Sequence, residues 1–288
     1  MPPEAMPVSP TLEATSAVLP PESRPGVSKP NPILTARGLV RSFGAFKAVD
    51  IQNLEIQEGV ITALIGPNGA GKTTFFNLAT GFDDTSEGSC WFQDQRITGL
   101  HNYQIARLGA VRTFQNTRAL TRLTVMENML FASQQQFGER LHRVYGAKWR
   151  RKEQQEKERA KELLDRFALT HMADEFAGTL SGGQRKLLEM ARALMAEPTM
   201  VLLDEPLAGV NPALGETILE HILALKAGGT TVLFIGHDMS AVRKVSDWVI
   251  CLAEGRVIAE GTHGEVGQNQ LVLDAYLGST RGGMSDDE

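Results

Sequence analysis

The sequence predicts an α/β fold whose core is a parallel sheet. Continuous apolar runs at residues 60–65, 200–203 and 231–235 are typical of strands that are buried on both faces. Between the last two runs, apolar residues from Leu214 to Leu225 recur at helical spacing. A strand, a helix and a further strand in this rhythm indicate parallel strands joined by right-handed crossovers.

The segments around this core predict two additions to it. Residues 33–59 form short apolar alternations separated by glycines, which favour an antiparallel strand layer. Residues 72–79 predict a helix that Gly81 stops. Residues 248–261 predict a hairpin that turns at Glu254-Gly255, and residues 271–277 predict a short final helix.

An inserted helical subdomain is expected at about residues 116–196, because this part is mostly polar with helical patterning. Its segment 148–167 is dense in charge, and Glu153 and Lys157 stand four apart in the favourable order. A solvated helix packed along one edge explains this segment, and a docking or membrane-facing surface is the alternative.

Both ends of the chain are expected to be loose. Residues 1–32 hold nine of the 13 prolines without a periodic apolar pattern, which predicts a disordered tail. The folded domain is then expected at residues 33–278, followed by a loose tail at 279–288.

Composition narrows the classes of function. A net charge of −5 argues against a broad basic surface for nucleic acid or anionic lipid. The two cysteines, Cys90 and Cys251, lie far apart in strand-like runs, so we expect buried thiols in a reducing compartment. The chain shows neither an apolar window of about 18 residues nor a secretory signal. It is therefore expected in the cytosol or held at a membrane by other proteins.

The segment that follows the first buried run has the pattern of a phosphate-binding loop. Its glycines permit positive φ angles and close approach to phosphate oxygens, and successive N–H groups with the next helix N-terminus form an anion site. Lys72 is expected to reach the β- and γ-phosphates of a nucleotide, and the Thr73 hydroxyl to ligate Mg²⁺. The nucleotide-binding residues predicted here are Gly66, Pro67, Asn68, Gly69, Ala70, Gly71, Lys72, Thr73 and Thr74.

Three polar residues follow the other two buried runs. Asp204 ends one run, where its carboxylate can support Mg²⁺, and Glu205 can polarise an attacking water. His237 follows the other run, so a parallel sheet brings it to the same edge. There it can bond the γ-phosphate or hold the water, although a lone histidine at a strand end is more often structural.

For two further motifs, the residue types and their spacing leave the role open. Gln115 lies where the strand-rich part meets the helical part, and its amide can bond Mg²⁺ or water and serve as a sensor. Residues Ser181, Gly182, Gly183 and Gln184 start a helix that is expected to run to Ala196. This second anion-accepting helix end faces phosphate on physical grounds, but the motif does not say whose phosphate.

Over residues 33–278 these motifs resemble the nucleotide-binding subunits of ATP-binding cassette (ABC) transporters. The resemblance implies a P-loop NTPase (RecA-like) fold: a parallel sheet core, an antiparallel β layer and an inserted helical subdomain. It implies ATP with Mg²⁺, Phe43 stacked on adenine, Gln115 as the lever to a membrane partner and Glu205 as general base. It also implies that residues 181–184 close on the ATP of a second cassette, head to tail.

Within that family the chain is similar to the branched-chain amino acid importer branch, on residues 111–116, the helical insert after Met129, residues 208–212 and residues 275–278. Urea-type importers share several of these. The branch implies a second cassette (a sister chain or a copy of this one), two transmembrane permease subunits and a solute-binding protein. It implies a peripheral position on the cytoplasmic face of the plasma membrane and no nucleic-acid partner.

The alternatives are a cassette for lipid or polysaccharide export, and a soluble cassette of chromosome maintenance or translation. The chromosome proteins need a very long coiled coil between Lys72 and Ser181, and the translation proteins usually need tandem cassettes; the sequence shows neither feature.

Overall fold

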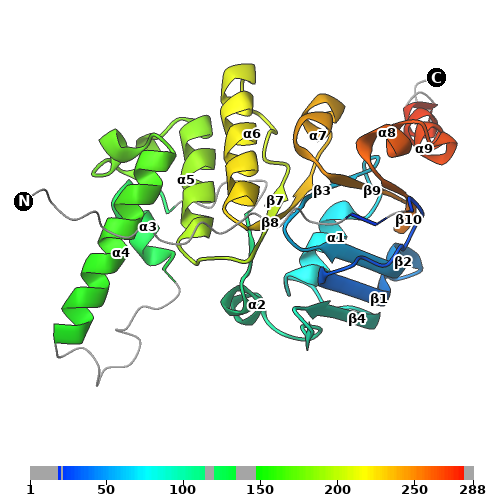
Figure 1. Ribbon diagram of the computed structural model, residues 1–288, viewed down its shortest axis with the longest axis horizontal. Helices are drawn as coiled ribbons and strands as arrows, with labels where there is room; N and C mark the ends of the chain where they lie inside the picture. The colour runs from blue at the N-terminus through cyan, green and yellow to red at the C-terminus, as the bar shows by residue number, and fades with distance from the viewer. Residues whose placement is uncertain (1–18, 21, 114–119, 134–146, 282–288) are drawn as a thin grey trace, which may run out of the picture.

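We describe the protein from a computed structural model, which covers residues 19–20, 22–113, 120–133 and 147–281. Two sheets are stacked with helices around them (Figure 1). The six-stranded sheet has the order β10-β9-β3-β8-β7-β6, and the four-stranded sheet has the order β2-β1-β4-β5.

The six-stranded sheet confirms the predicted parallel core. The strands β9, β3, β8, β7 and β6 run parallel to their neighbours, and β10 is an antiparallel edge. The bounds are β3 Ile61–Ile65, β6 Ala110–Arg112, β7 Met200–Asp204, β8 Thr231–Ile235, β9 Trp248–Ala253 and β10 Arg256–Gly261. Every residue of β3, β7 and β8 is buried, as the continuous apolar runs predicted.

The predicted antiparallel layer is also present. Strands β1 (Pro32–Phe43) and β2 (Phe46–Gln57) pair as a long hairpin, and β4 (Glu87–Phe92) joins β1 on its other side. The short β5 (Gln95–Arg96) completes the sheet.

Two apolar clusters sandwich the six-stranded sheet, because alternate residues of each buried strand point to opposite faces. On one face, Leu64, Leu202 and Leu233 pack with helix α1 and the antiparallel layer. On the other face, Val201 and Phe234 pack with the helices that follow β6. The helices are α1 Lys72–Ala79, α2 Asn102–Leu108, α3 Val125–Phe131, α4 Ala147–Arg166, α5 Gly182–Leu194, α6 Pro212–Ala227, α7 Met239–Val245, α8 His263–Gly267 and α9 Gln270–Arg281.

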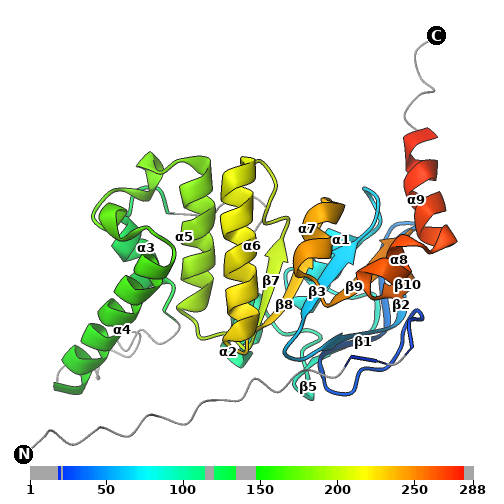
Figure 2. The same ribbon diagram turned by 45° about the horizontal axis from the view of Figure 1, so that its top comes forward.

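The helical part lies at one end of the molecule. Figures 1 and 2 place α3 and α4 farthest from the antiparallel layer, with α5 and then α6 between them and the sheet core. Two short 3₁₀ turns, Thr170–Met172 and Ala177–Thr179, connect α4 to α5. The charged helix α4 is anchored by buried Leu163 and Leu164, with Phe167 buried just after its last residue.

The N-terminal segment differs from the expectation of a loose tail through residue 32. Val27 and Lys29 are buried, and both are tied to Glu260 of β10: the Val27 N–H donates to Glu260 Oε1 at 2.9 Å, and Lys29 Nζ lies 2.5 Å from Oε2. Proline content alone did not predict this, because the segment is ordered by bonds to residues more than 200 positions away. Residues 1–18 and 21 lie outside the described residues.

The C-terminal helix also extends beyond its expected range. Helix α9 continues to Arg281, past position 279 where a loose tail was expected. It lies beside α8 at the opposite end of the molecule from α4 (Figure 2). Among the helices of the described part of the chain, none has both the length and the apolar character needed to cross a bilayer.

Candidate nucleotide-binding site

The predicted phosphate loop, residues 66–73, connects the end of β3 to the start of α1. Two of its glycines are required by their surroundings. A Cβ on Gly66 would lie 2.1 Å from the Leu252 carbonyl oxygen, and one on Gly71 would lie 2.4 Å from that of Ala48. Gly71 also has a φ of 98°, which glycine adopts without strain. The loop is therefore pressed against the backbones of β9 and β2, and substituted glycines would displace it.

Lys72 begins α1 and its ammonium group turns back onto the loop. Its Nζ donates to the carbonyl oxygens of Gly66 at 2.8 Å and Pro67 at 2.9 Å. Burial lowers the pKa of Lys72, whereas the nearby Glu205 carboxylate favours its charged form. A partly desolvated cation that donates to two carbonyl groups at the mouth of an N–H-rich loop is suited to exchange those carbonyls for phosphate oxygens.

Asp204 is the last residue of β7, and its two carboxylate oxygens have different surroundings. Oδ2 lies 2.6 Å from an Arg112 guanidinium nitrogen, in a pair that is almost fully buried. Oδ1 is buried, and no residue in the described part of the chain donates a hydrogen bond to it. Such an oxygen needs a ligand, because an unpaired buried acceptor is costly. A Mg²⁺ ion fits this requirement.

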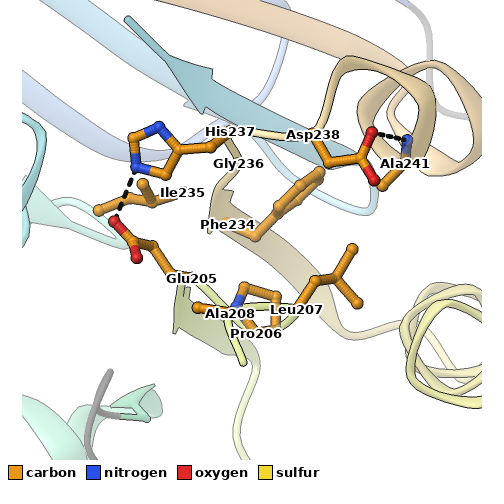
Figure 3. Close-up of a pocket in the computed structure, with 10 residues that line it drawn as sticks. All are labelled: Glu205, Pro206, Leu207, Ala208, Phe234, Ile235, Gly236, His237, Asp238 and Ala241. Carbon is orange, nitrogen blue, oxygen red and sulfur yellow. Dashed lines mark hydrogen bonds and ion pairs between the residues drawn. The ribbon is translucent and has the colours of Figure 1, made fainter. Parts of the chain in front are cut away.

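Glu205 and His237 meet at the carboxyl edge of the sheet, as the parallel topology predicted. Asp204 is paired in register with Ile235 on the neighbouring strand, so the residues that follow both strands lie side by side. His237 Nε2 is 2.7 Å from Glu205 Oε1 (Figure 3). Glu205 has a positive φ of 49°, an uncommon conformation for a residue with a side chain. The pair borders a cavity of about 160 Å³.

Lys186 of helix α5, in the helical part, binds the loop that follows Glu205. Lys186 Nζ donates to the carbonyl oxygens of Glu205 at 3.0 Å and Ala208 at 2.7 Å. Burial lowers the pKa of Lys186, against the opposing effect of Glu189. A movement of α5 would therefore be transmitted directly to the backbone of Glu205.

Phe43 ends β1 at the tip of the β1–β2 hairpin, opposite Phe46, and half of its surface is exposed. The Arg41 guanidinium lies over its ring, 4.7 Å from the centroid. The same end of β2 carries Ala48, whose carbonyl touches Gly71. The hairpin tip thus lies on the phosphate-loop side of the layer, where an exposed ring can stack on a base.

The second glycine motif starts α5, as predicted, and it is closed on itself. Ser181 Oγ accepts from the Gln184 N–H at 3.2 Å, and Gln184 Oε1 accepts from the Ser181 N–H at 2.9 Å. Ser181 and Gly182 are exposed, while Gly183 packs tightly against Leu214 of α6. Helix α5 packs in the apolar cluster on one face of the sheet and α1 in the cluster on the other, and both views place α6 between the two helices, so this motif lies apart from the phosphate loop of its own chain (Figures 1 and 2).

The structure brings together the phosphate loop, Asp204, Glu205 and His237. Gln115 lies outside the described residues. Sequence reasoning missed the partners Arg112, Lys186 and Tyr276, whose hydroxyl accepts a hydrogen bond from the Gly66 N–H at 2.9 Å. For Arg112 a signal was present, because a basic residue ending a strand beside the Asp204 strand is a candidate partner for that carboxylate.

The sequence comparisons identify relatives along most of the chain. The family model described as "ABC transporter" matches residues 49–208. The "probable branched-chain amino acid transport ATP-binding protein LivG" of Archaeoglobus fulgidus is 40% identical over 247 residues, which is 86% of this chain and 96% of that protein. The "high-affinity branched-chain amino acid transport ATP-binding protein LivG" of Escherichia coli is 40% identical over 250 residues, 86% of this chain and 98% of that protein.

Solved structures resemble the whole fold. An ATP-binding cassette of an ABC transporter in its ADP conformation superposes with a TM-score of 0.73 at 36% identity, covering 86% of this chain and 99% of that one. A bacterial ABC transporter cassette in a dimeric structure superposes with a TM-score of 0.67 at 25% identity, covering 80% of this chain and 98% of that one.

Proposed function

The chain belongs to the ABC transporter family, and from that premise we propose that its ATP hydrolysis drives the import of branched-chain amino acids. The observation that carries the chemistry is the Glu205–His237 pair at 2.7 Å, beside Lys72 and the open oxygen of Asp204. A carboxylate, an imidazole and an ammonium group at one sheet edge are what the cleavage of a terminal phosphate requires.

In the proposed reaction, the loop amides and Lys72 hold the phosphates. Lys72 exchanges its hydrogen bonds to the Gly66 and Pro67 carbonyls for bonds to phosphate oxygens. The ammonium group then balances part of the negative charge of the phosphates. Glu205 accepts a proton from the attacking water, and His237 orients that carboxylate through the bond between them. Phe43 stacks on the adenine from the exposed hairpin tip.

Thr73 and Asp204 would hold a Mg²⁺ ion next to the phosphates, where the ion would neutralise charge that develops during phosphoryl transfer. The open, buried Asp204 Oδ1 supports this assignment. Arg112 fixes the other oxygen of the same carboxylate and so keeps Oδ1 turned away from the ion pair. Gln115 is proposed as a further ligand and as the lever toward the membrane subunits.

We infer that the site is completed by a second cassette, head to tail. Ser181 and Gly182 are exposed at the N-terminus of α5, a helix that packs on the opposite face of the sheet from α1. A helix N-terminus favours an anion, and the γ-phosphate on the opposite cassette supplies one. Binding of ATP then pulls two molecules together, and hydrolysis releases them.

The solute and the membrane partners are inferred from the relatives, whose names give branched-chain amino acid transport. We propose two permease subunits, a solute-binding protein and a position on the cytoplasmic face of the plasma membrane. The cassette shifts the permeases only through its different affinity for ATP in the two states of the transporter. Co-purification from detergent-solubilised membranes with two polytopic subunits is the expected result, and recovery with ribosomes or DNA would refute this assignment.

The Glu205→Gln variant tests the reaction. It keeps the shape and bonding reach of the side chain but removes the base, so hydrolysis is expected to fall by about 10²- to 10⁴-fold. Nucleotide binding is retained, so size-exclusion chromatography with ATP is expected to show a trapped dimer. Glu216→Gln, in an exposed pair with Lys244, is the control that changes neither. A Glu205→Gln protein that hydrolyses ATP normally would remove Glu205 from the mechanism.

A further inference from the structure

The C-terminal helix α9 reaches the phosphate loop from 210 residues away in the sequence. The Tyr276 hydroxyl accepts a hydrogen bond from the Gly66 N–H, with 2.9 Å between oxygen and nitrogen. Gly66 is the first residue of the loop, directly after β3. The contact therefore joins the last helix of the fold to the point where the nucleotide site begins.

The backbone of Gly66 is held at both its N–H and its carbonyl oxygen. Its N–H donates to Tyr276, and its carbonyl oxygen accepts from Lys72 Nζ at 2.8 Å. Its Cα is pressed against the Leu252 carbonyl of β9, where a Cβ would have no room. When Lys72 turns to a phosphate, its bond to Gly66 is given up. The bond to Tyr276 is unaffected by that exchange and continues to fix the origin of the loop.

The position of Tyr276 is set by packing as well as by its hydroxyl. Val272, one helical turn earlier, is buried in the core cluster on the helix-covered face of the sheet, and Tyr276 packs against the same cluster. Leu271, Leu273 and Leu277 are on the exposed part of α9. One face of the helix is thus anchored, which aims the phenol ring at the loop.

The hydroxyl remains neutral under ordinary conditions. Burial raises the pKa of Tyr276, and the nearby Cys251 thiol acts in the same direction. Burial also raises the pKa of Cys251 to about 12, so neither group carries a negative charge that would compete with nucleotide phosphates for Lys72.

We propose that Tyr276 is a positioning residue for the phosphate loop, which couples the docking of α9 to nucleotide affinity. This inference deepens the proposed function and rests on it. The Tyr276 bond restrains the loop before and after the phosphate is cleaved, so it contributes to ground-state binding and transition-state binding alike. By thermodynamic reciprocity, bound nucleotide must stabilise the docked helix by the same factor.

The test is Tyr276→Phe, which removes one oxygen and leaves the Gly66 N–H without its acceptor. Without this bond the origin of the loop is less restrained in the free protein, so nucleotide must order it on binding, and we expect the dissociation constants of ATP and ADP to rise by about five- to tenfold. We expect KM to rise by the same factor and kcat at saturating ATP to stay within about twofold. This pattern is expected when a substitution weakens the ground state and the transition state equally. Isothermal titration calorimetry and steady-state kinetics measure the two effects.

Two variants separate the hydroxyl from the packing of the helix. Leu273→Ala alters an exposed side chain of α9 and is expected to bind ATP like the wild type. Tyr276→Leu also removes the ring, so it is expected to lower the melting temperature further than Tyr276→Phe but to show the same nucleotide affinity. A Tyr276→Leu affinity well below that of Tyr276→Phe would assign the effect to packing and overturn the role of the hydroxyl.

Hydrogen exchange tests the reciprocal effect. ATP is expected to slow amide exchange in α9 of the wild type, and to slow it less in Tyr276→Phe. The inference is overturned if the ATP affinity of Tyr276→Phe stays within twofold of wild type, or if kcat falls while KM is unchanged. A wild-type protein that binds no ATP would instead refute the proposed function, so the two failures are distinguishable.

Discussion

The two glycine-containing helix starts of this chain, at residues 66–73 and 181–184, are built in opposite ways. The first is enclosed: Lys72 is buried, and Gly66 and Gly71 are pressed against carbonyl groups of neighbouring strands. The second is open, since Ser181 is exposed and its cap is closed only by Gln184. Two glycine-containing helix starts thus give one motif that is enclosed by its own chain and one exposed surface that can accept a partner.

The largest effect is expected at Lys72, in the enclosed motif. Lys72→Ala removes the cation of the enclosed site and the bonds that hold the Gly66 and Pro67 carbonyls, so the dissociation constant of ATP is expected to rise by about 100-fold or more. Equilibrium titration with ATP measures it. Lys157→Ala, which alters a partly exposed i,i+4 pair on α4, is the matched control with unchanged affinity. ATP affinity within threefold of wild type in Lys72→Ala would contradict an enclosed site that depends on this ammonium group.

A methyl group placed at Gly71 tests how tightly the first site is enclosed. The new Cβ would lie 2.4 Å from the Ala48 carbonyl at a φ of 98°, so Gly71→Ala must displace the loop. We expect a loss of more than about 2 kcal/mol in the free energy of unfolding and a loss of nucleotide binding. Chemical denaturation and ATP titration check both, and a variant with wild-type stability would show that the loop has room.

The same substitution at Gly182 tests the open helix start at residues 181–184. Among the described residues, no atom outside its chain neighbours and its own helical turn lies within 4 Å of a Cβ built there, so Gly182→Ala is expected to leave the stability and the ATP affinity of the monomer unchanged. It is expected to weaken ATP-dependent dimerisation, because a methyl group would stand where the proposed partner approaches. Analytical ultracentrifugation of the Glu205→Gln background with and without Gly182→Ala measures this. An unaffected dimer would place the partner elsewhere.

The smallest expected effect is at Ser181. Ser181→Ala removes the oxygen that caps α5, which is expected to cost about 1 kcal/mol of stability in the single chain. Thermal unfolding measures that cost. If Ser181 acts only as a cap, ATPase activity is expected to follow stability; if it also meets phosphate across the pair, activity falls in a protein that remains folded at the assay temperature.

Much of the candidate site could be predicted because it depends on short-range rules. A buried strand followed by a glycine-rich turn and a helix predicted a phosphate loop at residues 66–73, and the structure has that strand–turn–helix arrangement. Parallel strands meet at one edge of a sheet, which predicted that Glu205 and His237 lie together, as they do. The helix predicted from the apolar spacing between Leu214 and Leu225 is observed as α6, Pro212–Ala227. The loose tail through residue 32 was wrong over residues 22–32, because burial by distant partners leaves no local pattern.

By itself, the sequence predicted the buried strands β3, β7 and β8, the helix α6 and the proposed set of phosphate-binding and acid–base residues, since these patterns depend on neighbours within a few positions. Only the tertiary structure decided which side chains hold that set in place: Arg112 on Asp204, Lys186 on the Glu205 carbonyl, and Tyr276 on Gly66. Each of these is a bond between segments that the fold brings together from far along the chain. The packing of whole helices and strands fixes the geometry of these bonds. Hydrophobic periodicity in the sequence predicts local secondary structure and does not predict that packing.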